Sequence, residues 1–284
     1  MKILILGAKG SLGQTFVDLY SAGGGSAFGG KDTNVTAWDR EELDITKENL
    51  VSEQIEKIKP QLVINCAAYN SVDKAEEERG VAEMINGTAV GFIAKACDAV
   101  GATMVHYSTG QVFDGTNSEG YNEDDKPIPV NAYGRSKLLG EMELQENIDN
   151  FYLIRTCWLY GKPAAGKKSF TDLILELAAQ GTTVNAVNNE FGSPTYVLDL
   201  AHATRALIGQ QKPFGIYHLI NSGVASRYDW TKEIFMTKGI KSEFNSVASN
   251  FFQRKAKRPK YEVLNNTKFI ELRSWTEALK EYLS

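Results

Sequence analysis

A short apolar run stands directly before three closely spaced glycines at the start of the chain. Ile3 to Leu6 form the run, and Gly7, Gly10 and Gly13 follow it. The apolar residues that come next recur at helical spacing: Leu12, Phe16, Val17 and Leu19. This order predicts a buried strand, a tight turn and an amphipathic helix.

The alternation of strand and helix patterns continues to about residue 160. Strands are predicted at the apolar runs NVTAW, QLVINCAAY, TMVHYS and FYLIRT. Helices are predicted near residues 46–58, 79–100 and 132–147, between successive runs. Because the runs are apolar on both faces, as parallel strands covered by helices are, the pattern predicts an α/β fold with a Rossmann-type doubly wound parallel sheet.

Beyond about residue 160 the alternation becomes less regular. A helix near 169–180 and short strands around 182–187 and 214–220 are predicted there. We expect residues 1–160 to form an NAD(P)-binding domain and residues 161–284 to form mainly a smaller substrate-binding lobe, with about 193–220 returning to the first domain. Substrate would lie between the two, outside the carboxyl ends of the strands.

The glycines of the first turn match the geometry of dinucleotide binding. A pyrophosphate must approach backbone N–H groups at a helix N-terminus, and a Cβ in the turn would block it. The residues expected to contact the cofactor here are Gly7, Lys9, Gly10, Ser11, Leu12 and Gly13. A second glycine-rich stretch, residues 21–31, is expected to be a flexible surface loop, since it lacks the flanking strand and helix of a second phosphate loop.

Acidic and basic side chains after the first two strands bear on the choice of cofactor. Asp39 is placed to accept a hydrogen bond from the adenosine ribose of NAD, whereas Arg40 and Lys9 could neutralise the 2′-phosphate of NADP. The glycine-rich stretch makes the spacing from Gly13 to Asp39 longer than usual. We expect NADPH as the cofactor, with NADH as the alternative.

Composition narrows the class of protein. The 284 residues are 43% hydrophobic and 23% charged, with a net charge of −4, which gives no electrostatic case for binding nucleic acid. No apolar run is long enough to span a bilayer and no signal peptide pattern is present, so we expect a cytoplasmic protein. The three cysteines and three histidines are scattered, so we expect free thiols and no metal site.

A tyrosine and a lysine four residues apart are the strongest catalytic candidates. Tyr133 and Lys137 would lie on one face of a helix, where the ammonium could lower the pKa of the phenol. Upstream, Ser108 and Thr109 end an apolar strand, and a hydroxyl there could donate a hydrogen bond to a substrate carbonyl. A surface pair and strand-end hydroxyls that bond to a turn are the alternatives.

Together these motifs resemble the extended short-chain dehydrogenase/reductases, and within them the dTDP-4-dehydrorhamnose reductase family. The resemblance runs through NCAAYNSVDKAEEE, STGQVFDG, NAYGRSKLLGE, IRTCWLYG, NEFGSPTYVLDLA, GIYHLINSG and KRPKYEVLNNTKF. It implies that Tyr133 gives a proton, that Lys137 holds the nicotinamide ribose, and that Thr109 lies beside the substrate ketone. The implied reaction is NAD(P)H-dependent reduction of the 4-keto group of dTDP-4-dehydro-L-rhamnose, which serves the synthesis of cell-surface polysaccharide.

The resemblance also implies further contacts. Beside the cofactor it places Asp44, Ile45, Ala67, Ala68 and Tyr69, in addition to Asp39, Arg40, Tyr133 and Lys137. Around the substrate it places Val72, Thr109, Tyr133 and Trp158. Without the resemblance, Trp158 would be taken equally well for a core aromatic, and the charged residues after Val72 for a solvated loop.

One departure from the family leaves alternatives open. The family usually reads STDYVF, and here Gly110 and Gln111 stand at the Asp and Tyr positions, which are implied to help hold the sugar. A reductase or epimerase for another nucleotide sugar is therefore the first alternative. A non-catalytic dinucleotide-binding subunit, similar to the one that accompanies methionine adenosyltransferase, is the second. A homodimer is a further expectation, and the basic residues between 254 and 260 are expected to be mainly an exposed patch.

Overall fold

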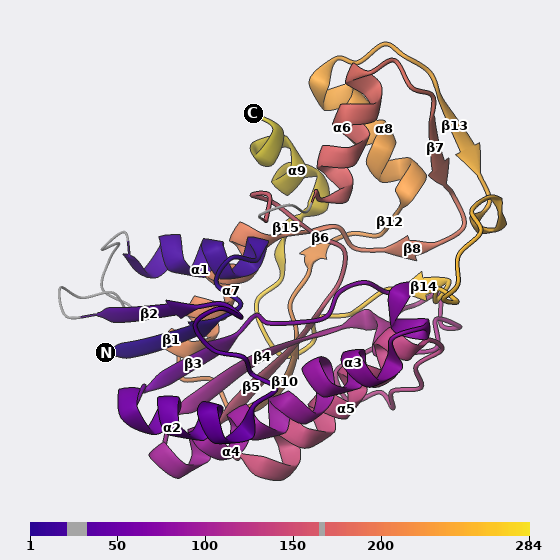
Figure 1. The fold of residues 1–284 in the computed structure, drawn as a ribbon. Helices are drawn as coiled ribbons and strands as arrows, with labels where there is room; N and C mark the ends of the chain where they lie inside the picture. The colour runs from indigo at the N-terminus through magenta and orange to yellow at the C-terminus, as the bar shows by residue number, and fades with distance from the viewer. Residues whose placement is uncertain (22–32, 165–167) are drawn as a thin grey trace.

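Six parallel strands form the central sheet of the protein (Figure 1). The structure is a computed structural model that describes residues 1–21, 33–164 and 168–284. The strands are β1 (Lys2–Leu6), β2 (Asn34–Trp38), β3 (Leu62–Asn65), β4 (Thr103–Thr109), β5 (Phe151–Thr156) and β10 (Gly215–His218). Their order across the sheet is β10-β5-β4-β3-β1-β2, so the chain runs outward from β1 in both directions. The expected loop at 21–31 lies, apart from its first residue, outside the described residues.

Helices cover both faces of this sheet because its strands bury alternate residues on opposite sides. Ile3 and Ile5 pack with α1 (Ser11–Ser21) and α7 (Val197–Gly209) on one face. Leu4 and Leu6 pack on the other face with α2 (Glu48–Ile58), α4 (Ala89–Val100) and α5 (Ala132–Asn147). This is the Rossmann-type arrangement that the sequence predicts.

A second, smaller cluster of elements lies beyond the carboxyl ends of the strands (Figure 1). It contains α6 (Phe170–Ala179), α8 (Arg227–Lys238), α9 (Trp275–Leu283) and the paired strands β7 (Val184–Val187) and β13 (Phe244–Val247). Beneath them, β8 (Phe191–Gly192) pairs with β12 (Ala225–Ser226) and β14 (Tyr261–Glu262). The lobe has its own apolar core around Trp230, Ile234 and Leu279.

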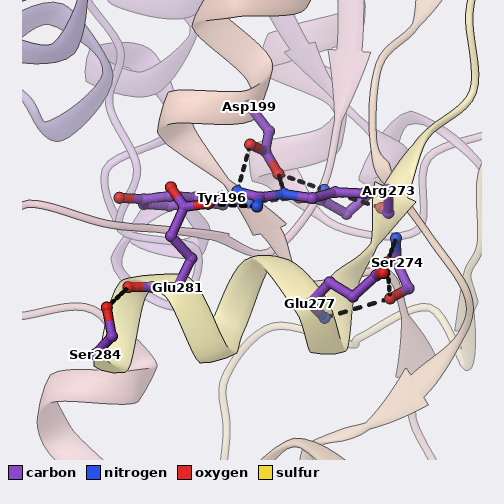
Figure 2. Close-up of polar contacts among 8 residues, drawn as sticks. Tyr196, Asp199, Arg273, Ser274, Glu277, Glu281 and Ser284 are labelled. Atoms are coloured by element: carbon purple, nitrogen blue, oxygen red, sulfur yellow. Dashed lines mark hydrogen bonds and ion pairs between the residues drawn. The ribbon is translucent and has the colours of Figure 1, made fainter.

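An ion-pair cluster ties this lobe to the sheet domain (Figure 2). The guanidinium of Arg273, in β15 (Leu272–Ser274), donates to both carboxylate oxygens of Asp199 in α7 at 2.8 Å. It also pairs with Glu281 of α9, and Ser274 forms a capping box with Glu277 at the start of that helix. The last helix of the chain is thus fixed in direction by its cap and in position by α7.

The expected helix at 79–100 contains an irregular turn that matters for the site. Between α3 (Arg79–Glu83) and α4, the segment Met84–Thr88 forms a π-helical turn. There the side chain of Asn86 accepts from the backbone N–H of Tyr69 at 2.8 Å and donates to the Tyr69 carbonyl and to Ser136 of α5. The turn therefore fixes the loop after β3 against the helix that carries Tyr133, in line with the common occurrence of π-bulges at functional sites.

The strand predicted for QLVINCAAY is shorter than expected. Only Leu62–Asn65 pair in the sheet, because Asn65 Oδ1 accepts a hydrogen bond from the N–H of Ala67 and the chain leaves the sheet at that point. Among the helices of the described residues, none combines the length and apolar character needed to cross a membrane.

Candidate functional site

One continuous cleft, with a volume of about 940 Å³, runs along the carboxyl ends of the strands. Every site residue expected from the sequence lines it: Gly7, Lys9, Gly10, Ser11, Leu12, Gly13, Asp39, Arg40, Asp44, Ile45, Ala67, Ala68, Tyr69, Val72, Thr109, Tyr133, Lys137 and Trp158. The fold thus brings together residues that are up to about 150 positions apart in the sequence, as the switch point of a doubly wound sheet does.

The glycine turn at one end of the cleft has no room for side chains. Gly7 has a φ of +73°, and a Cβ there would lie 2.6 Å from the backbone N of Ala67. A Cβ on Gly13 would lie 2.2 Å from the carbonyl oxygen of Gly7, so helix α1 and the turn are in direct contact. Beside them Ser11 Oγ is buried without a hydrogen-bond partner among the described residues. An unpaired hydroxyl next to the first N–H groups of a helix fits the phosphates of a dinucleotide.

The residues expected to select the cofactor lie just after β2. Both carboxylate oxygens of Asp39 accept backbone N–H groups, one from Lys9 at 3.0 Å and one from Arg40 at 2.8 Å. The ammonium of Lys9 pairs with the exposed Glu41 at 2.8 Å. Asp39 therefore holds the glycine turn against β2, and the exposed guanidinium of Arg40 is the cation at this edge of the cleft.

Thr109 and Tyr133 meet where β4 ends. Thr109 Oγ1 accepts from the N–H of Gln111 at 3.1 Å and lies 3.4 Å from a carboxylate oxygen of Glu262. Ser108, its neighbour, instead donates to the buried Glu141. Of the two strand-end hydroxyls, Thr109 is the one available to a ligand.

The expected effect of Lys137 on Tyr133 is wrong for this structure. Burial raises the pKa of the Tyr133 phenol, the nearby Glu262 raises it further, and the Thr109 hydroxyl opposes the rise. The ammonium of Lys137 donates to the carbonyl oxygen of Tyr107 at 2.6 Å and lies 3.3 Å from Nε2 of His106. The sequence places Tyr133 and Lys137 one turn apart, but it could not show that burial outweighs the distant positive charge at the phenol.

Lys137 itself is deeply buried for a lysine. Burial lowers its pKa to about 8, although Glu141 opposes the shift. His106 is fully buried beside it, and burial lowers the pKa of that imidazole well below its usual value, so the ring is neutral at pH 7. His106 Nδ1 lies 3.1 Å from the side-chain nitrogen of Asn65. These buried partners fix the position of the ammonium at the floor of the cleft.

The helix that carries Tyr133 and Lys137 is capped by a side chain with three partners. Asn131 Oδ1 accepts from the N–H of Gly134 at 2.7 Å, which is the N-cap bond of α5. Its Nδ2 donates to Gln111 Oε1 at 3.0 Å and to the Lys257 carbonyl at 2.8 Å. Gln111, which departs from the family pattern, therefore supports the start of helix α5.

A buried carboxyl that sequence reasoning missed lies in the cleft beside Thr109 and Trp158. Glu262, in the two-residue strand β14, is 5% exposed, and its Oε2 accepts from Trp158 Nε1 at 3.1 Å. Burial raises its pKa to about 7, while the Trp158 hydrogen bond and the Arg227 charge oppose the rise. Its only sequence signal is one acidic residue in the run KRPKYEVLNNTKF, which no spacing rule singles out.

Arg227, the first residue of α8, is the second residue that was missed. Its guanidinium lies 3.9 Å from the centre of the Trp158 ring, close to the ring face. Arg227 lines the cleft, and within residues 1–21, 33–164 and 168–284 its guanidinium has no hydrogen-bond partner. Trp158 has a left-handed φ of 49°, which is uncommon for a bulky residue and directs its ring between Arg227 and Glu262.

Comparison with known proteins decides the family. The family described as the RmlD substrate binding domain matches residues 1–284. The spore coat polysaccharide biosynthesis protein SpsK of Bacillus subtilis is 35% identical over 99% of this chain and 96% of its own length. A dTDP-4-dehydrorhamnose reductase of Clostridium acetobutylicum is 36% identical, with a TM-score of 0.92 over 100% of this chain and 98% of that chain.

The same enzyme of Bacillus anthracis, solved in complex with NADP, is 34% identical, with a TM-score of 0.91 over 99% of this chain and 98% of that chain. The chain belongs to the dTDP-4-dehydrorhamnose reductase family. The resemblance and the fold class expected from the sequence are thereby confirmed. The roles of Thr109, Tyr133 and Lys137 stay predictions, and the structure adds that all three line one cleft.

The basic residues near the C-terminus are mostly paired rather than free in this reductase-family chain. Arg254 pairs with Glu190 at 2.8 Å, and Arg258 pairs with Asp73 at 2.6 Å, while Lys255 contacts Glu77. Among the described residues that line the cleft, none comes from this basic group. The pairs with Asp73 and Glu77 hold this segment against the loop after Val72, and a contact with the diphosphate finds no support here.

Replacing Glu262 with glutamine is expected to change how stability depends on pH. The pKa of Glu262 is raised from 4.5 to about 7, so between these values the folded protein holds a proton that the unfolded chain releases. The contribution of the Glu262 carboxyl to the free energy of unfolding is therefore fully present below pH 4.5 and is lost as the pH rises through 7. Relative to wild type, Glu262→Gln should gain about 2 kcal/mol between pH 5 and pH 8.

Denaturant unfolding of both proteins at the two pH values measures the difference. The matched control is Glu119→Gln, at an exposed glutamate. A stability difference between wild type and Glu262→Gln that does not change with pH would show that the carboxyl is already ionised at pH 5.

Proposed function

We propose that the protein reduces the 4-keto group of dTDP-4-dehydro-L-rhamnose with NADPH and gives dTDP-L-rhamnose, in the cytoplasm, for cell-surface polysaccharide synthesis. The observation that carries the proposal is the cleft itself, in which the glycine turn and Thr109, Tyr133 and Lys137 converge. Two full-length relatives at 34% and 36% identity bear the name dTDP-4-dehydrorhamnose reductase, and one of them was solved with NADP.

The side chains suggest how the ketone is reduced. The glycine turn with Ser11 would hold the diphosphate of NADPH, and Lys137 would hold the nicotinamide ribose. When bound, the reduced nicotinamide supplies the hydride to the carbonyl carbon. Tyr133 gives its proton to the carbonyl oxygen, and Thr109 donates a hydrogen bond to the same oxygen as negative charge develops. One hydride and one proton added to the ketone give the alcohol, leaving NADP⁺ and a Tyr133 phenolate that recovers its proton from water before the next turnover.

The protonation state of Tyr133 agrees with this role. A phenol that donates a proton must carry it at neutral pH, and burial together with Glu262 keeps the Tyr133 phenol protonated. The Lys137 ammonium, with a pKa of about 8, remains largely charged at pH 7. The pair therefore begins the reaction in the protonation states that proton donation requires.

Arg40 is expected to provide the preference for NADPH. Its exposed guanidinium lines the cleft beside Asp39, whose carboxylate holds the backbone of the glycine turn through the N–H of Lys9. We expect Arg40→Ala to raise KM for NADPH by about 10-fold, the effect of losing one charge-assisted hydrogen bond, and to leave KM for NADH unchanged. Steady-state kinetics with both cofactors measures this, with Lys57→Ala, an exposed lysine of α2 outside the cleft, as the control.

The decisive assay is consumption of NADPH and of NADH with dTDP-4-dehydro-L-rhamnose, with the product identified by mass. Turnover of this substrate at a kcat/KM above that of other 4-keto nucleotide sugars supports the proposal. Preference for another 4-keto sugar would favour the related reductase that Gly110 and Gln111 leave open. No turnover on any sugar, with copurification of a synthetase, would favour the non-catalytic subunit.

A further inference from the structure

Position 110 and Glu262 compete for one space beside Thr109. Gly110 follows β4 directly, and a Cβ built on it would lie 2.7 Å from Cγ of Glu262. A real Cβ contact is never that short, so a side chain at position 110 and the present position of Glu262 exclude each other. The glycine that departs from the family pattern is therefore the residue that gives Glu262 its place.

The Glu262 carboxylate faces the cleft with acceptor capacity to spare. Oε2 accepts one hydrogen bond, from Trp158 Nε1 at 3.1 Å, and Oε1 lies 3.4 Å from Thr109 Oγ1. Each carboxylate oxygen can accept about two hydrogen bonds, so one site on each oxygen remains. A buried carboxylate with open acceptor sites is costly unless a ligand or water provides donors.

Aromatic and charged side chains form a closely packed pocket around Glu262. The Trp158 ring is covered by the Arg227 guanidinium on one side, and it stacks parallel to Trp230 with a centroid distance of 6.1 Å. Gly192 leaves no gap beneath the ring, because a Cβ there would lie 2.8 Å from it. Because Arg227 and Gly192 cover the ring, the group that this pocket offers to a sugar is the Glu262 carboxylate at the ring edge, to which a hydroxyl can donate.

We propose that Glu262 is a substrate-positioning residue that accepts a hydrogen bond from the hydroxyl on the carbon next to the ketone. The inference rests on the proposed function, since Thr109 marks where the ketone oxygen lies. Because Glu262 Oε1 lies 3.4 Å from Thr109 Oγ1, the carboxylate is placed beside a substituent on a carbon next to the ketone carbon. In a 6-deoxy-4-keto sugar this substituent is the C3 hydroxyl, because the other neighbour, C5, carries only the methyl group and the ring oxygen and has no hydroxyl to donate.

The test compares two substrates, dTDP-4-dehydro-L-rhamnose and its 3-deoxy analogue. Wild type should prefer the full sugar by about 10- to 100-fold in kcat/KM, the range for one hydrogen bond to a charged group. Glu262→Ala should remove this preference by losing activity on the full sugar alone. Glu262→Gln keeps the side-chain volume and one acceptor oxygen, so its preference for the full sugar should fall between those of wild type and Glu262→Ala. It also provides the test if the alanine variant does not fold.

A second, independent test moves the carboxylate from position 262 to position 110. Gly110→Asp alone should lose activity because its Cβ collides with Glu262, whereas Gly110→Asp combined with Glu262→Ala should recover part of the preference for the full sugar. A residue that only supports Trp158 would give no such recovery. Glu190→Ala, which removes a carboxylate outside the cleft, is the matched control and should leave the substrate preference unchanged.

The outcomes separate this inference from the proposed function. Wild type that turns over neither sugar would overturn the proposed function. Wild type that turns over both sugars equally would overturn the role of Glu262, and so would equal losses on both sugars in the Glu262 variants. Loss confined to the full sugar, with recovery in the double variant, supports the positioning role.

Discussion

Tyr133→Phe is expected to lower kcat for ketone reduction by about 10²- to 10⁴-fold, the contribution usual for a general acid. The variant keeps the aromatic ring in the cleft and loses only the hydroxyl that supplies the proton. Because the glycine turn and Lys137 are untouched, the affinity for NADPH should stay close to that of wild type. Single-turnover kinetics gives the rate of the chemical step, and quenching of protein fluorescence by NADPH gives the affinity.

A control variant and a pH profile of the wild type complete the test of Tyr133 as the proton donor. Tyr228→Phe removes a phenol outside the cleft and should leave kcat unchanged. In wild type, the raised pKa of Tyr133 predicts that the rate of the chemical step does not fall between pH 7 and pH 9 through ionisation of this phenol. Turnover of Tyr133→Phe near the wild-type rate would remove Tyr133 from the role of proton donor.

Arg155→Ala is expected to destabilise the fold by about 3–5 kcal/mol, the cost of leaving one charge of a buried pair without its partner. Arg155 of β5 and Glu141 of α5 are 2% and 1% exposed, and Arg155 Nη2 lies 2.7 Å from Glu141 Oε2. Glu141 also accepts from Ser108, the residue before Thr109. The pair thus joins helix α5, which carries Tyr133, to the end of β4, which carries Thr109.

Denaturant unfolding monitored by circular dichroism measures the effect. Arg155→Met combined with Glu141→Leu removes both charges and should lose less than either single change. Lys162→Ala breaks the exposed pair with Asp18 and should cost less than about 1 kcal/mol. A loss for Arg155→Ala as small as that for Lys162→Ala would mean that solvent reaches the buried carboxylate.

The sequence is a good guide to the sheet domain because its signals there are periodic and local. Ile3 to Leu6 are buried on both faces, and the strand, the glycine turn and the helix α1 follow one another directly in the sequence. The family motifs placed Thr109, Tyr133 and Lys137 at one cleft for the same reason. Each of these residues lies at the end of a strand or the start of a helix whose pattern is clear.

What could not be predicted depends on packing between distant segments. Glu262 comes to Thr109 from 153 residues away, on a strand of two residues without a hydrophobic pattern. The protonation of Tyr133 and Lys137 depends on burial, which spacing along a helix does not report. The π-helical turn at Asn86 is a change of hydrogen-bond register within a run that has ordinary helical periodicity.

The side-chain amide of Asn131 has a mechanical consequence. It is fully buried, and through Gln111, Gly134 and the carbonyl of Lys257 it joins the turn after β4, the first turn of α5 and the C-terminal segment. A shift of the segment at Lys257 is therefore transmitted through this one buried amide to the start of α5, two residues before Tyr133. The position of the phenol in the cleft thus depends on where the C-terminal segment lies.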